Sequence, residues 1–212
     1  PLEGITGYIV RNAFAHHFPY IDKYFTPFFP AAKKMNKKIM RDLIPENNPG
    51  ITLVPQLMLN DAEDLRMMGA QLEQMGFTTV NLNCGCPSGT VVSKRRGAGI
   101  LGDPDELDRF LENAFDICPL SISVKTRIGM ESEDEWEKLC KIYARYPLEE
   151  LIVHPRVRSD FYSNSPRLDA FSYAVEMIRV PLGYNGDINT VEDYERIHTL
   201  FPTVDRVMIG RG

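Results

Sequence analysis

The runs LSISVKT (residues 120–126) and ELIVH (150–154) have the length and apolar character of strands, and an amphipathic stretch near 132–146 separates them. This order predicts two parallel strands joined by a crossover helix. The same alternation continues outward in both directions. Further strand-like runs are 21–28, 51–57, 78–83, 180–185 and 205–210, and helical stretches are expected near 6–17, 33–43, 60–75, 104–117, 168–178 and 191–200.

Seven strands alternating with helices predict an α/β protein with a parallel sheet. A strand ending near Pro1 would be the eighth, and eight strand–helix units indicate a (β/α)8 TIM barrel. A doubly wound open sheet is the alternative, although no GxGxxG motif follows the first strand. The chain starts in a loop-like stretch and stops after a strand and a glycine turn. We therefore expect one domain over residues 1–212, truncated at both ends.

The composition narrows the functional classes. It is globular, with 43% hydrophobic and 25% charged residues. The net charge of -5 gives no overall nucleic-acid signature, so an RNA partner would need local basic patches or a part of the protein outside this sequence. No apolar run approaches the length of a membrane-spanning helix. Four cysteines do not suggest a disulfide scaffold, and we expect a cytoplasmic location.

Polar residues and glycines gather at the ends of six successive predicted strands, where barrel enzymes place their chemistry. They are Gln56, Asn83, Lys125 with Arg127, His154, Asn185–Gly186–Asp187 and Gly210–Arg211–Gly212. The ends of the last two strands suit a phosphate, because glycine lets backbone amides approach an anion and Arg211 adds charge. A pair of tight turns is the alternative interpretation.

Lys125 and His154 are informative individually. Strand alternation places Lys125 on the same face as Ser121 and Ser123. A lysine there is costly unless it meets an anion, such as a reduced flavin, or reaches solvent at the barrel mouth. His154 is the one histidine of four at the end of a clear strand, and both a structural and a functional role fit it.

Three clusters of basic residues are possible nucleic-acid contacts. Arg156, Arg158 and Tyr162 follow His154 and suit phosphate or base contacts. Lys94 and Arg95 belong to SKRRGAG (93–99), and the third cluster is AAKKMNKK (31–38). Surface charge runs are usually only solvated, so the third cluster is the weakest of the three.

The loop NLNCGCPSG (81–89) contains Cys84 and Cys86 at a spacing of two. Zinc sites and redox pairs more often use CxxC, and no second pair lies nearby, so we predict no metal site. A single functional thiol remains, or two inert ones. Cys86 lies between Gly85 and Pro87 in the loop, whereas Cys84 directly follows the strand and suits packing. A free thiol is mostly protonated at neutral pH and can donate a proton.

Taken together, these motifs resemble the tRNA-dihydrouridine synthase family. NLNCGCPSGTVVSKRRGAGIL is similar to the family's N-x-G-C-P loop, and PLEGITG to its first-strand motif Pro-Met-Glu-Gly-Val-Thr-Asp. PQL, VKTRIG, VHPRVRSDFY, NGDI and VMIGRG follow in the family's order, so the resemblance spans residues 1–212. The departures are Leu2 for methionine, Pro155 and Val157 within H-G-R-T, and Asp160 for a frequent glutamine.

The resemblance implies an FMN-bound TIM barrel, followed beyond residue 212 by a helical tRNA-binding domain. It implies that NADPH or NADH reduces FMN, that hydride passes to C6 of a flipped tRNA uridine, and that Cys86 protonates C5. The expected FMN contacts are Pro1, Leu2, Glu3, Gln56, Lys125, His154, Asn185, Gly186, Asp187, Gly210 and Arg211. The expected substrate contacts are Asn83, Arg156, Arg158, Tyr162, Lys94 and Arg95.

Two other functions remain open at this point. A flavin barrel that reduces a free pyrimidine would use similar chemistry, and a barrel that only binds RNA would not be an enzyme. The GCP loop and the basic-aromatic residues after His154 favour tRNA. We expect a monomer, and the sequence does not indicate which uridine of tRNA is modified.

Overall fold

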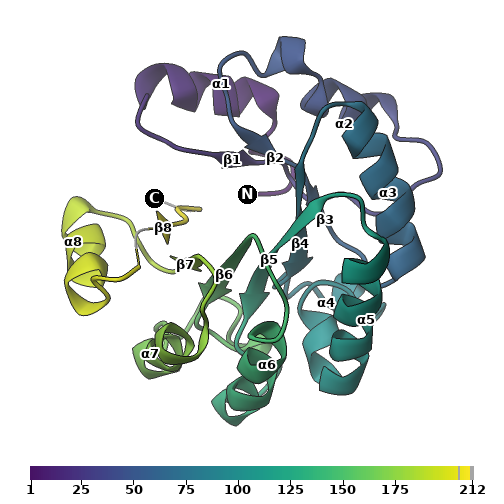
Figure 1. Ribbon diagram of the computed structural model, residues 1–212. Helices are drawn as coiled ribbons and strands as arrows, with labels where there is room; N and C mark the ends of the chain where they lie inside the picture. Colours follow the sequence, from purple (N-terminus) through teal and green to yellow (C-terminus); the bar gives the residue numbers. More distant parts are fainter. Residues whose placement is uncertain (205, 211–212) are drawn as a thin grey trace.

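A computed structural model describes residues 1–204 and 206–210. Parallel strands form its centre, with helices around them (Figure 1). Strands β3 to β8 pair in chain order in one sheet, and β1 pairs with β2. The strands are β1 (Tyr24–Phe25), β2 (Leu53–Val54), β3 (Gln56–Leu57), β4 (Thr79–Cys84), β5 (Ser121–Arg127), β6 (Glu150–His154), β7 (Leu182–Tyr184) and β8 (Arg206–Val207).

Pro55 connects the two sheets. It separates β2, which pairs with β1, from β3, which pairs with β4, so one predicted strand run takes part in both. Proline has no amide proton to donate to a ladder, but the Pro55 carbonyl accepts from the Asn81 amide at 2.8 Å. Phe29 forms a parallel bridge to Leu57. The strands thus follow one parallel arc in chain order, which is the (β/α)8 fold that the sequence predicts.

Each predicted helical stretch contains a helix. The helices are α1 (Tyr8–His17), α2 (Lys37–Leu43), α3 (Ala62–Gln74), α4 (Gly89–Val92), α5 (Pro104–Ile117), α6 (Trp136–Tyr143), α7 (Leu168–Met177) and α8 (Val191–Leu200). The short α4 was not predicted. Asp61, Asp103 and Thr190 cap α3, α5 and α8, and the side chain of each accepts a hydrogen bond from a backbone amide in the first turn of its helix. None of the described helices is long and apolar enough to cross a membrane.

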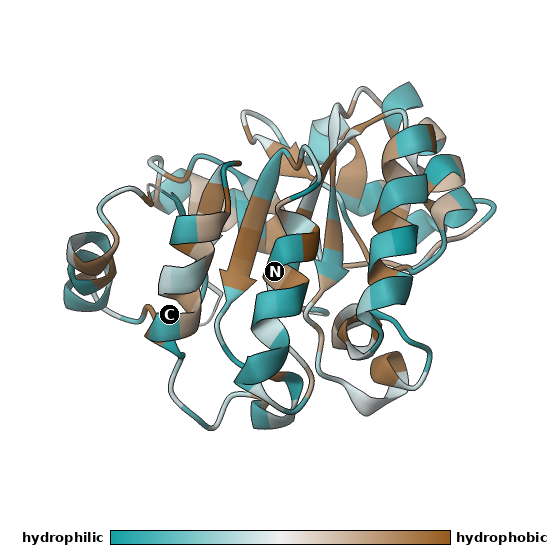
Figure 2. Cartoon of the chain, turned by 60° about the horizontal axis from the view of Figure 1, so that its bottom comes forward, coloured by the Kyte–Doolittle hydropathy of each residue, from teal (hydrophilic) through white to brown (hydrophobic). Residues whose placement is uncertain are grey.

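The core lies between the strands and the surrounding helices. Hydrophobic residues are concentrated on the central strands, and the helices turn polar residues outward (Figure 2). On β5, Ile122, Val124 and Thr126 are almost fully buried, whereas Lys125 on the opposite face is half-buried. The alternation predicted for this strand is confirmed, and it leaves Lys125 facing the barrel interior.

A buried carboxylate connects β8 with the segment before β1. Glu150 lies at the start of β6 and is 3% exposed. It accepts hydrogen bonds from Lys23, which precedes β1, at 3.2 Å and from Arg206 on β8 at 3.0 Å. No strand pairing joins β8 to β1 within residues 1–204 and 206–210. Side chains therefore provide the link between these two strands.

Candidate active site

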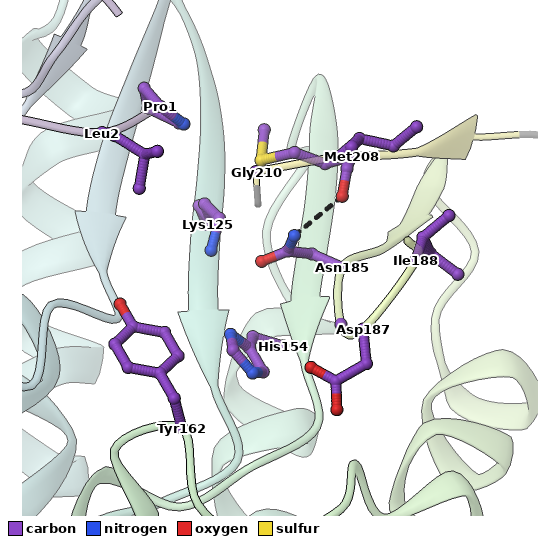
Figure 3. Close-up of a pocket in the computed structure, with 12 residues that line it drawn as sticks. Pro1, Leu2, Lys125, His154, Tyr162, Asn185, Asp187, Ile188, Met208 and Gly210 are labelled. Atoms are coloured by element: carbon purple, nitrogen blue, oxygen red, sulfur yellow. Dashed lines mark hydrogen bonds between the residues drawn. The ribbon is translucent and has the colours of Figure 1, made fainter. Parts of the chain in front are cut away.

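Two adjoining cavities lie at the carboxyl ends of the strands and share five lining residues: Pro1, Leu2, Lys125, His154 and Tyr162. The larger, of about 220 Å³, extends to the cysteine loop (residues 83–89). The smaller, of about 80 Å³, extends to the ends of β7 and β8 (Figure 3). Lys125 lies where the two meet, so its ammonium group can face a ligand that occupies both.

Most of the predicted site residues line these cavities. The larger cavity adds Glu3, Gln56, Asn83 and Cys86, and the smaller adds Asn185, Gly186, Asp187 and Gly210. Arg211 lies outside the described residues. The fold therefore collects side chains from the first residues to the last described strand at one end of the barrel, as expected for this architecture.

Four predicted substrate contacts lie away from the cavity walls. Lys94 and Arg95 are exposed in the loop after α4, where Arg95 pairs with Glu106 at 2.6 Å. Arg158 donates from Nε to the Pro87 carbonyl at 3.2 Å. Arg156 is only 2% exposed. The assignment of these residues to RNA contacts stays a prediction, and Arg156 also has internal partners.

The side chain of Asn83 folds the cysteine loop. Its oxygen accepts hydrogen bonds from the backbone amides of Gly85 at 3.1 Å and Cys86 at 2.9 Å. Its nitrogen donates to the side-chain oxygen of Gln56 at 2.9 Å. Gln56 in turn donates to the side-chain oxygen of Asn81 at 2.7 Å. A chain of side-chain amides, of which Gln56 and Asn81 are fully buried, therefore runs across the barrel interior and ends at the backbone of Cys86.

A close backbone approach holds Cys86 from its other side. The amide of Ala98 donates to the Cys86 carbonyl at 3.0 Å. Gly97 has φ of 56°, and a Cβ there would lie 2.8 Å from the Cys86 carbonyl oxygen and 2.9 Å from its Cβ. Glycine is required both by the positive φ and by this contact. The segment after α4 therefore fixes the position of the thiol.

Cys84 and Cys86 differ in environment. Cys84 is 1% exposed, and burial raises the pKa of its thiol to about 12, although a hydrogen bond with Tyr143 opposes the shift. Cys86 is half-buried and lines the larger cavity. The packing role predicted for Cys84 is confirmed. No group of three or more His, Cys, Asp or Glu side chains within residues 1–204 and 206–210 could hold a metal ion.

Lys125 is a desolvated cation at the centre of the site. Burial, and secondly the nearby Arg127 guanidinium, lower the pKa of Lys125 to about 8. The lysines that form ion pairs in the described part of the chain are Lys23, Lys138 and Lys141. A desolvated ammonium group without a carboxylate partner among the described residues favours a ligand that carries negative charge.

Arg127, which the sequence marked only as a strand-end residue, ties two loops together. It is 1% exposed. Its guanidinium donates to the Gly85 carbonyl at 2.9 Å, to the Val157 carbonyl at 2.9 Å and to the Phe161 carbonyl at 2.6 Å. It also lies 5.3 Å from the centre of the Tyr162 ring. One buried side chain thus holds the cysteine loop against the segment that follows β6.

Arg156 is likewise a buried arginine that joins two segments, because it bonds both His154 and Asp187. Its Nη1 donates to Nε2 of His154 at 3.0 Å and to one carboxylate oxygen of Asp187 at 3.0 Å, and its Nη2 donates to the other. Because arginine only donates, Nε2 of His154 accepts, and the proton of the neutral ring lies on Nδ1. Asn185 bonds the Met208 carbonyl at 2.7 Å, linking the ends of β7 and β8 (Figure 3).

Sequence comparison covers the whole chain: the dihydrouridine synthase (Dus) family model matches residues 1–212. The chain belongs to the dihydrouridine synthase family. It is 28% identical over 221 residues to the tRNA-dihydrouridine(16) synthase of Pseudomonas putida, covering all of this chain and 68% of that protein. It is 31% identical over 169 residues to the enzyme of the same name from Pseudomonas syringae, covering 79% of this chain and 53% of that protein. This chain thus spans about half to two thirds of these dihydrouridine synthases.

Solved structures agree with the barrel architecture. Morphinone reductase matches with a TM-score of 0.63 at 13% identity, covering 88% of this chain and 72% of that one. A variant of NCR from Zymomonas mobilis matches with a TM-score of 0.55 at 12% identity, covering 88% and 70%. At such identities the likeness concerns the fold of this dihydrouridine synthase family member. The predicted fold and the family resemblance are both confirmed.

Proposed function

We propose that the protein reduces a uridine of tRNA to 5,6-dihydrouridine, with FMN as cofactor and NADPH or NADH as reductant. The observation that carries this proposal is that the Cys86 thiol and the Lys125 ammonium group line one cavity of about 220 Å³. One is a proton donor and the other a stabiliser of negative charge. Family membership and the names of the curated relatives support tRNA as the substrate of the whole protein.

The donor set around Lys125 fits a flavin. Lys125 is a desolvated cation without a carboxylate partner among the described residues, and Gln56 and His154 contribute amide and imidazole groups beside it. At the ends of β7 and β8, Gly186 and Gly210 line the smaller cavity, and a Cβ at Gly210 would meet nothing within 4 Å. There the backbone is open to a phosphate group. Reduced FMN, when bound, supplies the hydride for C6 of the uracil ring.

The residues of the chain account for the other requirements of the reaction. Cys86 donates the proton to C5 of the uracil ring, which is general acid catalysis worth about 10²–10⁴ in rate. Asn83 and Gly97 hold the thiol in place through its backbone. With FMN bound, the Lys125 ammonium group would stabilise the negative charge that the flavin gains on reduction. The uridine must leave its stack to reach this cavity.

The substitution Cys86→Ala in the full-length protein tests the proposal. We expect FMN absorbance and tRNA binding to be retained and dihydrouridine formation to fall by about 10²–10⁴. Cys84→Ala is the matched control, because it removes a thiol two residues away that is buried and lines neither cavity. Equal loss from both substitutions would reject the assignment. Consumption of free uracil in place of tRNA would favour a pyrimidine reductase.

Position 16 of tRNA is the proposed target. The relatives from Pseudomonas putida and Shigella flexneri, at 28% and 29% identity over all of this chain, are both named tRNA-dihydrouridine(16) synthase. Dihydrouridine mapping of tRNA from a deletion strain tests this proposal. Loss of dihydrouridine at another position, with position 16 intact, would reassign the target but not the reaction.

A further inference from the structure

Two neighbouring aromatic side chains are exposed beside the cavities. Phe161 is 45% exposed and Tyr162 is 48% exposed, in the segment that follows β6. Tyr162 lines both cavities and lies 6.2 Å from the His154 ring, ring centre to ring centre (Figure 3). Phe161 lines neither. Aromatic rings are normally buried for their large apolar surface, so an exposed pair at the edge of a site indicates a binding surface.

The backbone of Phe161 has a conformation that usually requires glycine. Its φ is 50° and its ψ is -93°. The Ser163 amide donates to the Asp160 carbonyl at 2.9 Å, so Phe161 is the second residue of a turn of the II′ type. The carbonyl of Phe161 is held at 2.6 Å by the buried Arg127. A bulky residue kept in a strained position by its surroundings points to a function for its side chain.

The ring of Phe161 is also anchored to the cysteine loop. The Arg158 guanidinium lies 5.1 Å from the centre of the ring. The Nε of Arg158 donates to the carbonyl of Pro87, the residue after Cys86, at 3.2 Å. The ring and the guanidinium therefore lie next to the loop that carries the thiol. They are therefore within reach of an RNA strand that delivers a base to Cys86.

We infer that Phe161 and Arg158 form a stacking platform for a nucleobase adjacent to the target uridine. The inference rests on the proposed function, because it requires a flipped uridine in the cavity. When the uridine leaves its stack, the neighbouring base loses a partner, and an aromatic ring replaces it. Stacking accepts any base, so the platform contributes affinity for RNA and not base selectivity. Arg158 adds a positive charge for the phosphate backbone.

The substitution Phe161→Gly in the full-length protein tests the platform. Glycine suits the positive φ, so the ring is lost without a penalty to the turn. We expect the KM for tRNA to rise about tenfold, as for the loss of one stacked base, while kcat changes less than about twofold. FMN content and the melting temperature should be unchanged or higher. Phe161→Tyr, which keeps a ring, should restore the KM.

Tyr20→Ala is the control, because Tyr20 is 93% exposed on the connection from α1 to β1 and lines neither cavity. Its KM should equal that of the wild type. A wild-type KM for Phe161→Gly overturns the platform but leaves dihydrouridine synthesis standing. Loss of FMN from Phe161→Gly overturns it as well, since the ring would then serve the flavin. A wild-type protein that leaves tRNA unreduced overturns both proposals.

Discussion

The side-chain oxygen of Asn83 accepts a hydrogen bond from the Cys86 amide at 2.9 Å. Asn83→Ala removes this bond and leaves the loop without its internal acceptor. We expect kcat to fall by about tenfold or more, because small displacements of a reacting group are costly, while FMN stays bound. Steady-state rates at saturating tRNA measure the effect. Asn83→Asp keeps an acceptor oxygen and should recover some of the rate, and a fully active Asn83→Ala would refute the role.

Gly97→Ala should displace the thiol from the opposite side. The added Cβ would meet the Cys86 carbonyl at 2.8 Å, at a backbone φ that favours glycine. We expect a loss of about 1–3 kcal/mol in the free energy of unfolding and a lower kcat. Gly89→Ala is the matched control, since a Cβ there meets nothing within 4 Å. Denaturant unfolding should give a clearly lower free energy of unfolding for Gly97→Ala than for Gly89→Ala. Equal values would contradict the close approach of Gly97 to Cys86.

Arg127→Lys should loosen both the cysteine loop and the segment that follows β6. A single ammonium group cannot serve the three carbonyls that the guanidinium reaches, and a buried carbonyl without a donor, such as that of Val157, costs about 1–3 kcal/mol. We expect a loss of about 2–4 kcal/mol in unfolding free energy and earlier proteolysis in the segment after β6. Arg95→Lys, at an exposed ion pair with Glu106, should change stability by less than about 0.5 kcal/mol. Similar losses in the two variants would be inconsistent with this role of Arg127.

Lys125→Met should stabilise the flavin-free protein while weakening FMN binding. The pKa of Lys125 in the folded protein is about 8, below its ordinary value of 10.5. Between these two pKa values the unfolded chain binds more protons than the folded protein. The loss of unfolding free energy that Lys125 causes in the wild type therefore shrinks as the pH rises through this window. We expect the variant to be more stable by roughly 1–3 kcal/mol at pH 7, with the difference lost by about pH 10.5. Urea unfolding across pH measures it, and a difference independent of pH would contradict the desolvated lysine.

The barrel and most cavity-lining residues could be predicted because they depend on local patterns. The alternation of β5 predicted that Lys125 faces inward, and it puts Arg127 on the same face. The contacts of Arg127 with the cysteine loop and the segment after β6 were not predicted. The role of Gly97 could not be predicted, since it depends on contact with Cys86 eleven residues earlier. Likewise the contact of Arg156 with Asp187 could not be predicted, because nothing in the sequence shows that these two residues meet.

The role of Asn83 could be predicted only in part. Its place at the end of a strand was predicted, but its hydrogen bonds to the loop and to Gln56 depend on a register that only the folded sheet defines. Nothing in the sequence indicated the unusual backbone conformation of Phe161. Its positive φ arises from the turn between Asp160 and Ser163 and from Arg127, which is distant in the sequence.

The ion pairs of Glu150 have a consequence for how the molecule moves. Along the arc from β3 to β8, each strand is held by a ladder of backbone hydrogen bonds that open together. Between β8 and the segment before β1, the Glu150 carboxylate holds Lys23 and Arg206, and these two contacts can break independently of each other. Slow opening motions of the barrel should therefore be concentrated between β8 and the segment before β1. We expect the barrel to open there first, while the paired strands β3 to β8 stay together.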